Sequence, residues 1–159
     1  MPEFHVRVAG DDLVFCAGHF ITLPGGVCER LHGHSYRVAA EVYGPLDDSG
    51  CVVDFVAVRD ALKAIFAELD HRMLLPTGHP AVRVDLRAGE VEVTFADRRW
   101  TFPQNDCLLL PVANTTTELL AEYVGRRLLD ALKQRCGLSS PRLRIEIGEG
   151  TGCSAVWEL

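Results

Sequence analysis

The chain has 159 residues, which is enough for one domain with a hydrophobic core, and we predict a single domain over residues 1–159. Hydrophobic residues make up 48% and charged residues 24%, as in ordinary globular proteins. The net charge of −6 disfavours nucleic acid or an anionic membrane surface as a partner. No apolar run approaches the roughly 20 residues of a membrane span, and the first residues lack a signal-peptide hydrophobic region. We therefore expect a cytoplasmic protein.

The six cysteines are scattered along the chain at positions 16, 28, 51, 107, 136 and 153. No two of them form a Cys-x-x-Cys pair. This spacing indicates neither a disulfide framework nor a zinc site made of cysteines. Most of these side chains are expected to be reduced core residues.

The first part of the chain predicts two strands. Residues 4–15 alternate imperfectly between apolar and polar, and they predict a strand or a bulged pair that ends at His19. Pro-Gly-Gly within 21–27 indicates a loop. The β-branched and aromatic residues that follow predict a second strand over about 33–44. Residues 44–50 have the composition of a turn.

A first helix is predicted from Asp54 to about Asp70. Asp54 is a suitable N-cap. One apolar stripe follows it at helical spacing: Phe55, Val58, Leu62, Ile65, Phe66 and Leu69. The helix ends on Asp70-His71, where an acid next to an imidazole is either a proton-transfer pair or a solvated helix end.

Residues 82–102 alternate in three short runs separated by turns, and they predict a small β-meander. A second helix then opens with Thr115-Thr-Thr-Glu118, which fits a capping box of the form S/T-x-x-E. Gly137 is expected to end this helix.

Two further strands are predicted at 142–147 and 153–159, with the glycine-rich turn 149–152 between them. Glu149 on this turn is either a solvated carboxylate or a ligand anchor. The order of strand, strand, helix, meander, helix, strand, strand predicts an α+β domain. Its four-stranded antiparallel sheet has two helices on one face, plus an inserted β-meander.

The strongest functional pattern is the run from Cys28 to His34, which holds a thiol and two imidazoles. His32 and His34 are two residues apart on a predicted strand, so both rings face the same side, and Gly33 between them allows close approach. His19, at the end of the preceding strand, is a candidate third ligand. Three imidazoles without a fourth protein ligand are typical of catalytic zinc. Taken alone, such a histidine pair is equally typical of ordinary strand residues.

The chain resembles a known family in six segments that keep the family's order. They are Phe15 to His19, Cys28-x-x-x-His32-Gly-His34, Val53 to Phe55, Leu69 to His71, Thr116-x-Glu118 and Glu149-x-x-x-x-x-Ala155. These motifs are similar to those of the 6-pyruvoyl-tetrahydropterin synthase and 6-carboxy-tetrahydropterin synthase family. The resemblance covers most of the chain outside about 73–111, which we expect to be an insertion.

The resemblance implies the tunnelling fold (T-fold), in which trimers close their sheets into a barrel and two trimers stack into a homohexamer. Active sites then lie at subunit interfaces. It assigns His19, His32 and His34 to a zinc cofactor and Cys28 to the general base. The assignment is chemically coherent, because zinc activates a bound hydroxyl and a nearby dication favours a thiolate.

The same resemblance assigns Asp70 and His71 to a proton relay, in which the carboxylate fixes the imidazole tautomer. It assigns Glu149 to the pterin ring, whose adjacent N–H groups a carboxylate can accept in parallel. Thr116 and Glu118 fall at the family's second pterin-contact segment. We therefore expect a small-molecule pterin substrate.

The spacing Cys-x-x-x-His-Gly-His looks like that of the bacterial 6-carboxy-tetrahydropterin synthases of queuosine and deazapurine biosynthesis. The leading expectation is thus a zinc-dependent lyase that converts 7,8-dihydroneopterin triphosphate to 6-carboxy-5,6,7,8-tetrahydropterin. Glu29 complicates it, because Glu-x-x-His-Gly-His is the pattern of members that cleave dihydroneopterin toward folate. Pyruvoyl-type triphosphate elimination is a third candidate activity, and an inactive pterin-binding homologue is a candidate of another class.

Overall fold

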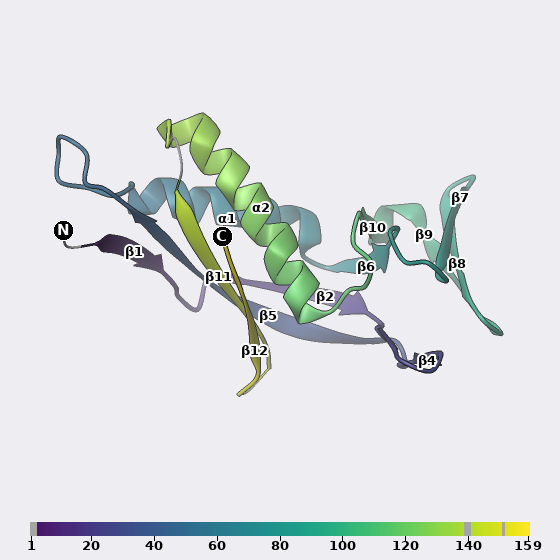
Figure 1. Cartoon of the computed structure of the whole chain (residues 1–159). Helices are drawn as coiled ribbons and strands as arrows, with labels where there is room; N and C mark the ends of the chain where they lie inside the picture. Colours follow the sequence, from purple (N-terminus) through teal and green to yellow (C-terminus); the bar gives the residue numbers. More distant parts are fainter. Residues whose placement is uncertain (1–2, 139–140, 151) are drawn as a thin grey trace.

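The computed structural model describes residues 3–138, 141–150 and 152–159. Within these residues, seven strands form one main sheet in the order β10-β6-β2-β5-β11-β12, with β1 also paired to β5 (Figure 1). The strands are β1 (Phe4–Val8), β2 (Val14–His19), β5 (His32–Gly44), β6 (Arg72–Pro76), β10 (Cys107–Leu110), β11 (Arg142–Glu149) and β12 (Ser154–Glu158).

Both helices, α1 (Phe55–Leu69) and α2 (Thr117–Cys136), lie on the same side of this sheet (Figure 1). Apolar side chains of the helices and the strands meet there in the main core, which includes the fully buried Leu62, Leu128 and Ile145. Asp54 caps α1 by accepting a hydrogen bond from the Val56 amide at 2.9 Å. The predicted α+β class and the predicted first helix are therefore confirmed.

The main sheet is larger than the four antiparallel strands expected. Strand β5 has 13 residues, so β2 pairs along its first half, from Val14↔Arg37 to His19↔His32, and β1 pairs along its second half. The interval expected to hold a bulged pair thus contains two separate strands. Strands β6 and β10 pair in parallel, and their residues are mostly buried without alternation. Such continuous apolar runs do not show the period-2 pattern of a strand.

The second helix begins one residue later than the capping box predicts. Thr116 is the N-cap, and its hydroxyl accepts from the Leu119 amide. The buried Thr115 instead donates its hydroxyl to the Phe20 carbonyl at 2.8 Å, and this bond joins two segments that are distant in the sequence. Gly137 ends the helix in the left-handed conformation at φ 64°, as expected for a C-terminal glycine.

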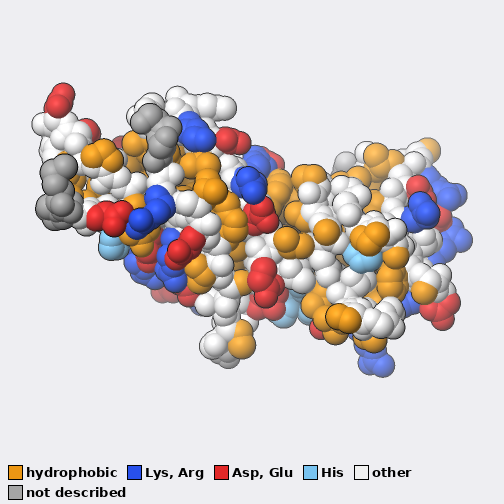
Figure 2. Space-filling view, in the orientation of Figure 1, with side chains coloured by type: hydrophobic (Ala, Val, Ile, Leu, Met, Phe, Trp, Pro, Cys, Tyr) orange, Lys and Arg blue, Asp and Glu red, His pale blue; other side chains and the backbone are white. Residues whose placement is uncertain are grey.

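A second, smaller region lies at one end of the molecule (Figure 1). Strands β7 (Arg83–Arg87), β8 (Glu90–Phe95) and β9 (Arg98–Pro103) form the predicted meander. Its apolar face packs on a second core around Phe20 and Met73. Its other face is charged, and Figure 2 shows basic side chains gathered at this end.

Between β2 and β5 the chain forms a hairpin of β3 (Thr22–Leu23) and β4 (Val27–Cys28), where we expected a loop. Each strand of it has two residues, so the segment has little support from backbone pairing. A short 3-10 turn, Gln104–Asp106, joins β9 to β10. Among the described residues, neither helix combines the length and the apolar character needed to cross a membrane.

Candidate metal centre and active site

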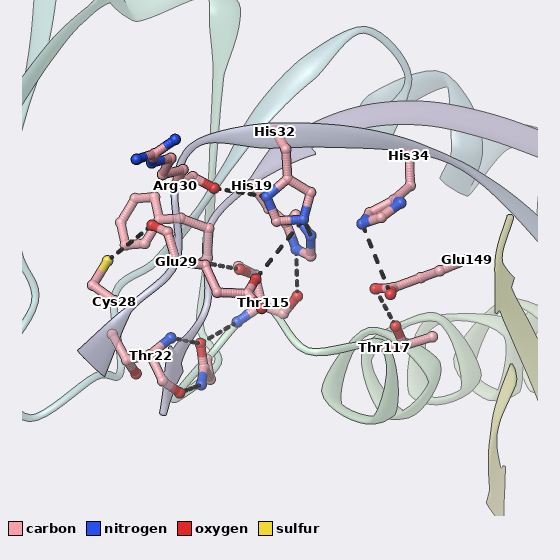
Figure 3. A network of polar contacts seen from close by, with 12 residues as sticks. His19, Thr22, Cys28, Glu29, Arg30, His32, His34, Thr115, Thr117 and Glu149 are labelled. Atoms are coloured by element: carbon pink, nitrogen blue, oxygen red, sulfur yellow. Dashed lines mark hydrogen bonds and ion pairs between the residues drawn. The ribbon is translucent and has the colours of Figure 1, made fainter. Parts of the chain in front are cut away.

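Three histidine rings converge at the end of β2 and the start of β5 (Figure 3). His19 and His32 are directly paired across the two strands, and His34 follows on the same face of β5. Each residue offers one ring nitrogen, and these nitrogens all lie within 4.8 Å of one another. The structure therefore brings together the three histidines that the sequence singles out. We call them the histidine cluster.

Backbone carbonyls hold two of these rings in place. His19 donates from Nδ1 to the Thr115 carbonyl at 2.8 Å, and His32 donates from Nδ1 to the Arg30 carbonyl at 2.7 Å. A carbonyl can only accept, so both protons are placed on Nδ1 and both Nε2 atoms carry lone pairs. These two Nε2 atoms are 3.2 Å apart. Two converging lone pairs with carbonyl-anchored rings fit a metal ion.

Burial reinforces this arrangement. His19 is 2% exposed, and burial lowers the pKa of its imidazole below the ordinary value. The neutral ring is the form that binds a metal. The Tyr36 hydroxyl lies 3.2 Å from the same Nδ1 of His19, and Tyr36 is itself fully buried.

Two glycines allow the strands to meet closely beside the cluster. Gly18 and Gly33 are paired across β2 and β5. A Cβ on Gly33 would lie 3.1 Å from the Ala17 carbonyl oxygen, and one on Gly18 would lie 3.2 Å from the Met73 sulfur. A side chain at Gly33 would require the Ala17 backbone to shift by a few tenths of an ångström, next to the strand ends that carry the histidines.

Glu149 faces the cluster from β11. One carboxylate oxygen is 3.8 Å from Nε2 of His34, and the other accepts a hydrogen bond from the Thr117 hydroxyl (Figure 3). Thr117 was not among the predicted site residues, because a threonine in the first turn of a helix carries no distinctive signal.

The three predicted pterin contacts lie around one cavity of about 380 Å³. Thr116 and Glu118 line it from the start of α2, and Glu149 lines it from β11. Residues at the start of the hairpin and of β12 form the rest of its wall. Its lining is Ile21, Leu23, Thr116, Thr117, Glu118, Glu149, Cys153, Ser154 and Ala155.

Glu29 and Cys28 point to different places. A Glu29 carboxylate oxygen lies 3.8 Å from Nε2 of His32. The Cys28 thiol donates to the Glu29 carbonyl at 3.4 Å and packs against the second core, apart from the three rings (Figure 3). Burial raises the pKa of the Cys28 thiol, and the Arg98 guanidinium opposes this shift. The structure therefore places the carboxylate, rather than the thiol, beside the histidine cluster.

Asp70 and His71 form a close pair at the end of α1. Asp70 is the C-cap of the helix, and its carboxylate accepts from the Cys16 amide and from Nδ1 of His71, both at 2.8 Å. The Cys16 amide, followed by His71, holds the pKa of the Asp70 carboxyl below its usual range. His71 has φ 56° and donates its own amide to the Cys16 carbonyl. The pair is thus built into the sheet and is not a loose helix end.

This pair belongs to the other face of the sheet. His71 is 82% exposed in its side chain and lines a cavity of about 520 Å³ together with Cys16 and Ser35, and His32 and His34 of the cluster also line this cavity. Ala17 and His19 are buried on the helix-covered face of β2. Cys16 alternates with them, so its side chain lies on the face that the helices do not cover. Among the described residues, no hydrogen bond or ion pair joins Asp70 or His71 to the histidine cluster.

The fold and the site define an α+β protein with the T-fold and a candidate metal site of three histidines. The 6-pyruvoyl tetrahydropterin synthase family matches residues 11–158, and the chain belongs to this family of lyases that act on pterins. A putative 6-carboxy-5,6,7,8-tetrahydropterin synthase of Methanocaldococcus jannaschii is 33% identical over 91% of this chain and 89% of its own length. The Bacillus subtilis 6-carboxy-5,6,7,8-tetrahydropterin synthase is 40% identical over 40% of this chain and 42% of its own.

Solved structures agree with the family. The 6-pyruvoyl tetrahydropterin synthase of Plasmodium falciparum has a TM-score of 0.89 and 27% identity, over 99% of this chain and 98% of that one. A Plasmodium vivax 6-pyruvoyltetrahydropterin synthase, in which a catalytic glutamate is replaced by cysteine, has a TM-score of 0.92 over 100% and 99% of the two chains. At 22% identity, the latter likeness supports the fold alone.

Proposed function

We propose that this chain is a zinc-dependent lyase that converts 7,8-dihydroneopterin triphosphate to 6-carboxy-5,6,7,8-tetrahydropterin, as in queuosine and deazapurine biosynthesis. The observation that carries the metal part is the pair of Nε2 atoms of His19 and His32, 3.2 Å apart with both Nδ1 atoms committed to carbonyls. The names of the curated relatives support the product.

Zinc suits this site because three neutral imidazoles would bind it and leave a coordination position open for substrate. His19, His32 and His34 would be its ligands. When bound, the metal would polarise a hydroxyl of the substrate side chain. The rest of the chemistry is assigned to side chains of the protein.

Glu149 is proposed to hold the pterin ring, because its carboxylate can accept two parallel N–H bonds from a 2-amino-4-oxo pyrimidine. The Thr117 hydroxyl orients this carboxylate from α2. Thr116 and Glu118 line the same cavity and complete the ring pocket. The ring would then direct its side chain toward the histidine cluster, since Glu149 lies beside His34.

Cys28 is proposed as the general base of the carboxy-forming reaction, on the basis of its spacing to His32. In the structure the thiol packs on the second core, so the Cys28 side chain must rotate toward the cluster before it can accept a proton. A nearby divalent cation would then favour the thiolate over the thiol.

A second candidate function follows from the position of Glu29. Its carboxylate already lies 3.8 Å from His32 and can accept a proton from a substrate hydroxyl held there. This geometry favours cleavage of the substrate side chain, which gives 6-hydroxymethyl-dihydropterin. Both candidates use the same histidine cluster and the same ring pocket, so they differ only in the base.

Product analysis separates the two candidates. Zinc-loaded protein is incubated with 7,8-dihydroneopterin triphosphate, and the pterin products are identified by mass spectrometry. We expect 6-carboxy-5,6,7,8-tetrahydropterin from the wild-type protein, and a loss of about 100-fold in its formation in Cys28→Ala, with little change in Glu29→Gln. If Glu29→Gln abolishes turnover while Cys28→Ala retains it, side-chain cleavage is the function.

Asp70 and His71 are proposed to serve as a proton relay for a neighbouring subunit. The Asp70 carboxylate binds the amide of Cys16, whose side chain faces away from the helices, and neither residue of the pair is bonded to the histidine cluster among the described residues. This role requires an oligomer, and we propose a homohexamer built as a dimer of trimers. Pairing between subunits would also satisfy the open backbone groups of the edge strands β10 and β12. Light scattering should report a hexamer or at least a trimer, and a fully active monomer would contradict this role.

A further inference from the structure

Arg98 makes the most direct contact between the meander and the segment that carries the candidate bases. Its Nη1 atom donates to the Cys28 carbonyl at 2.8 Å and to the Glu29 carbonyl at 2.9 Å. Two consecutive carbonyls are thus fixed by one guanidinium from a strand that lies far along the chain. Hydrogen bonds with a charged donor are stronger than neutral ones.

Arg98 is itself held by aromatic packing. Its guanidinium carbon lies 4.8 Å from the centre of the Trp100 ring, at cation–π distance. Trp100 stacks on Phe20, with ring centres 4.6 Å apart and an interplanar angle of 14°. Phe20 is fully buried and directly follows His19. Packing of Arg98 on Trp100, and of Trp100 on Phe20, therefore fixes the position of the guanidinium relative to the histidine cluster.

The backbone around Cys28 and Glu29 has few other constraints. The hairpin pairs only Thr22 with Cys28 and Leu23 with Val27, and the Glu29 amide donates to the Ile21 carbonyl at 2.9 Å. Arg98 donates to both carbonyls, and the Glu29 carbonyl also accepts from the Cys28 thiol at 3.4 Å. Both candidate bases project from this short segment, so the position of its backbone decides how near either side chain can lie to the cluster.

We propose that Arg98 is a positioning residue, which holds the Cys28 and Glu29 backbone so that the catalytic base of the proposed lyase stays within reach of the histidine cluster. The inference rests on the proposed function and extends it, since it gives the meander a part in catalysis. Arg98 donates to two carbonyls, its charge also opposes the rise in the pKa of the Cys28 thiol, and it makes no hydrogen bond to the three histidines. Loss of its side chain should therefore reduce turnover without removing metal.

The first test compares three variants in zinc-loaded protein. Arg98→Ala should lower kcat at least about tenfold, while KM stays within about threefold and bound zinc is unchanged. Arg98→Lys keeps a cationic donor and should recover part of the loss. Arg99→Ala is the matched control, because Arg99 is the adjacent residue on β9, points to the opposite face and pairs with Glu92. An equal loss in Arg99→Ala, or a rise in KM alone, would overturn the proposal.

A double-mutant cycle distinguishes positioning from a general structural role. Arg98→Ala is combined with whichever of Cys28→Ala and Glu29→Gln has lost turnover. If Arg98 acts through that base, its removal should cost less than about twofold in the variant that lacks the base. A loss as large as in the wild-type background would show that Arg98 acts independently of the base and would contradict the inference.

Hydrogen exchange, measured without substrate, tests the role of Arg98 independently of the proposed function. Arg98→Ala should speed hydrogen exchange of the Glu29 amide about tenfold, whereas exchange in the paired residues of β2 and β5 should not change. Unchanged exchange at Glu29 would refute the role of Arg98. If wild-type protein turns over no pterin, the proposed function fails, and the exchange result alone then decides whether Arg98 holds this segment.

Discussion

The histidine cluster and the segment of Cys28 and Glu29 lie side by side, but different kinds of contact hold them. The histidines belong to long paired strands, and carbonyls from Thr115 and Arg30 fix two of the rings. The Cys28 and Glu29 segment follows a hairpin with two residues in each strand and depends on side chains from distant parts of the chain. The candidate metal site is therefore built into the sheet, whereas the candidate bases lie on a segment that side chains hold in place.

The anchors of the hairpin show this dependence. The Asn114 side chain donates to the Thr22 carbonyl at 2.9 Å and accepts from the Thr22 amide at 3.3 Å. His79 lies 2.7 Å from the Thr22 hydroxyl, and its other ring nitrogen accepts from the amides of Ala81 and Val82. That second nitrogen cannot carry a proton, so His79 donates to Thr22. A change at His79 or Thr22 should affect the hairpin and leave the histidine cluster in place, whereas Asn114 also accepts from the amide of Thr115, whose carbonyl holds His19.

The largest effect is expected from His32→Ala. Two imidazoles rarely hold zinc tightly, so this variant should lose more than about 100-fold in zinc affinity and most of its turnover. Metal analysis of the purified variant by mass spectrometry checks the expectation. Full zinc occupancy in His32→Ala would remove the contrast between the two regions, because the sheet would then not supply the metal ligands. His5→Ala, a histidine outside the cluster, is the matched control and should keep its zinc.

A smaller effect is expected from His79→Ala. The substitution removes one hydrogen bond between the hairpin and the loop before β7 and two within that loop, and it should lower the free energy of unfolding by about 1–3 kcal/mol. Zinc content should remain that of the wild-type protein. Thermal unfolding and metal analysis of the same sample test both statements. Thr22→Val, which removes only the hydroxyl partner, should show a smaller loss of stability, and a loss of zinc in either variant would argue against independent support of the two regions.

The smallest effect concerns pH. Burial lowers the pKa of His79 below its ordinary value of 6.5. The folded protein then binds fewer protons than the unfolded one between the lowered pKa and 6.5, so this contribution to stability is complete above about 6.5 and is lost as the pH falls. His19 has a shift of the same sign, so we compare wild-type protein with His79→Ala in denaturant titrations. The stability difference between them should shrink from about pH 7 to about pH 5, and a difference that grows would contradict the assignment.

The parts that could be predicted from sequence follow from local periodicity. His32 and His34 share a face because of strand alternation, and the amphipathic stripe and Asp54 define α1. The cavity lined by Glu149, Thr116 and Glu118 agrees with the family resemblance, although their roles remain proposals.

The remaining features depend on contacts between distant segments. The buried runs of β6 and β10 show no alternation, and Thr115 was predicted as a cap because its bond to Phe20 cannot be read from local sequence. The Glu29 position beside His32 and the Arg98 contacts arise from packing across the second core. Spacing alone favoured Cys28 as the residue that faces the histidines.

The most direct test of the proposed metal centre is a zinc titration of metal-free protein, followed by both bound metal and pterin product. We predict that turnover of 7,8-dihydroneopterin triphosphate rises in proportion to bound zinc and saturates at about one zinc per chain. His32→Ala should show neither tight binding nor the rise in turnover. Full turnover in protein that holds no metal would contradict a catalytic role for the histidine cluster as a zinc site.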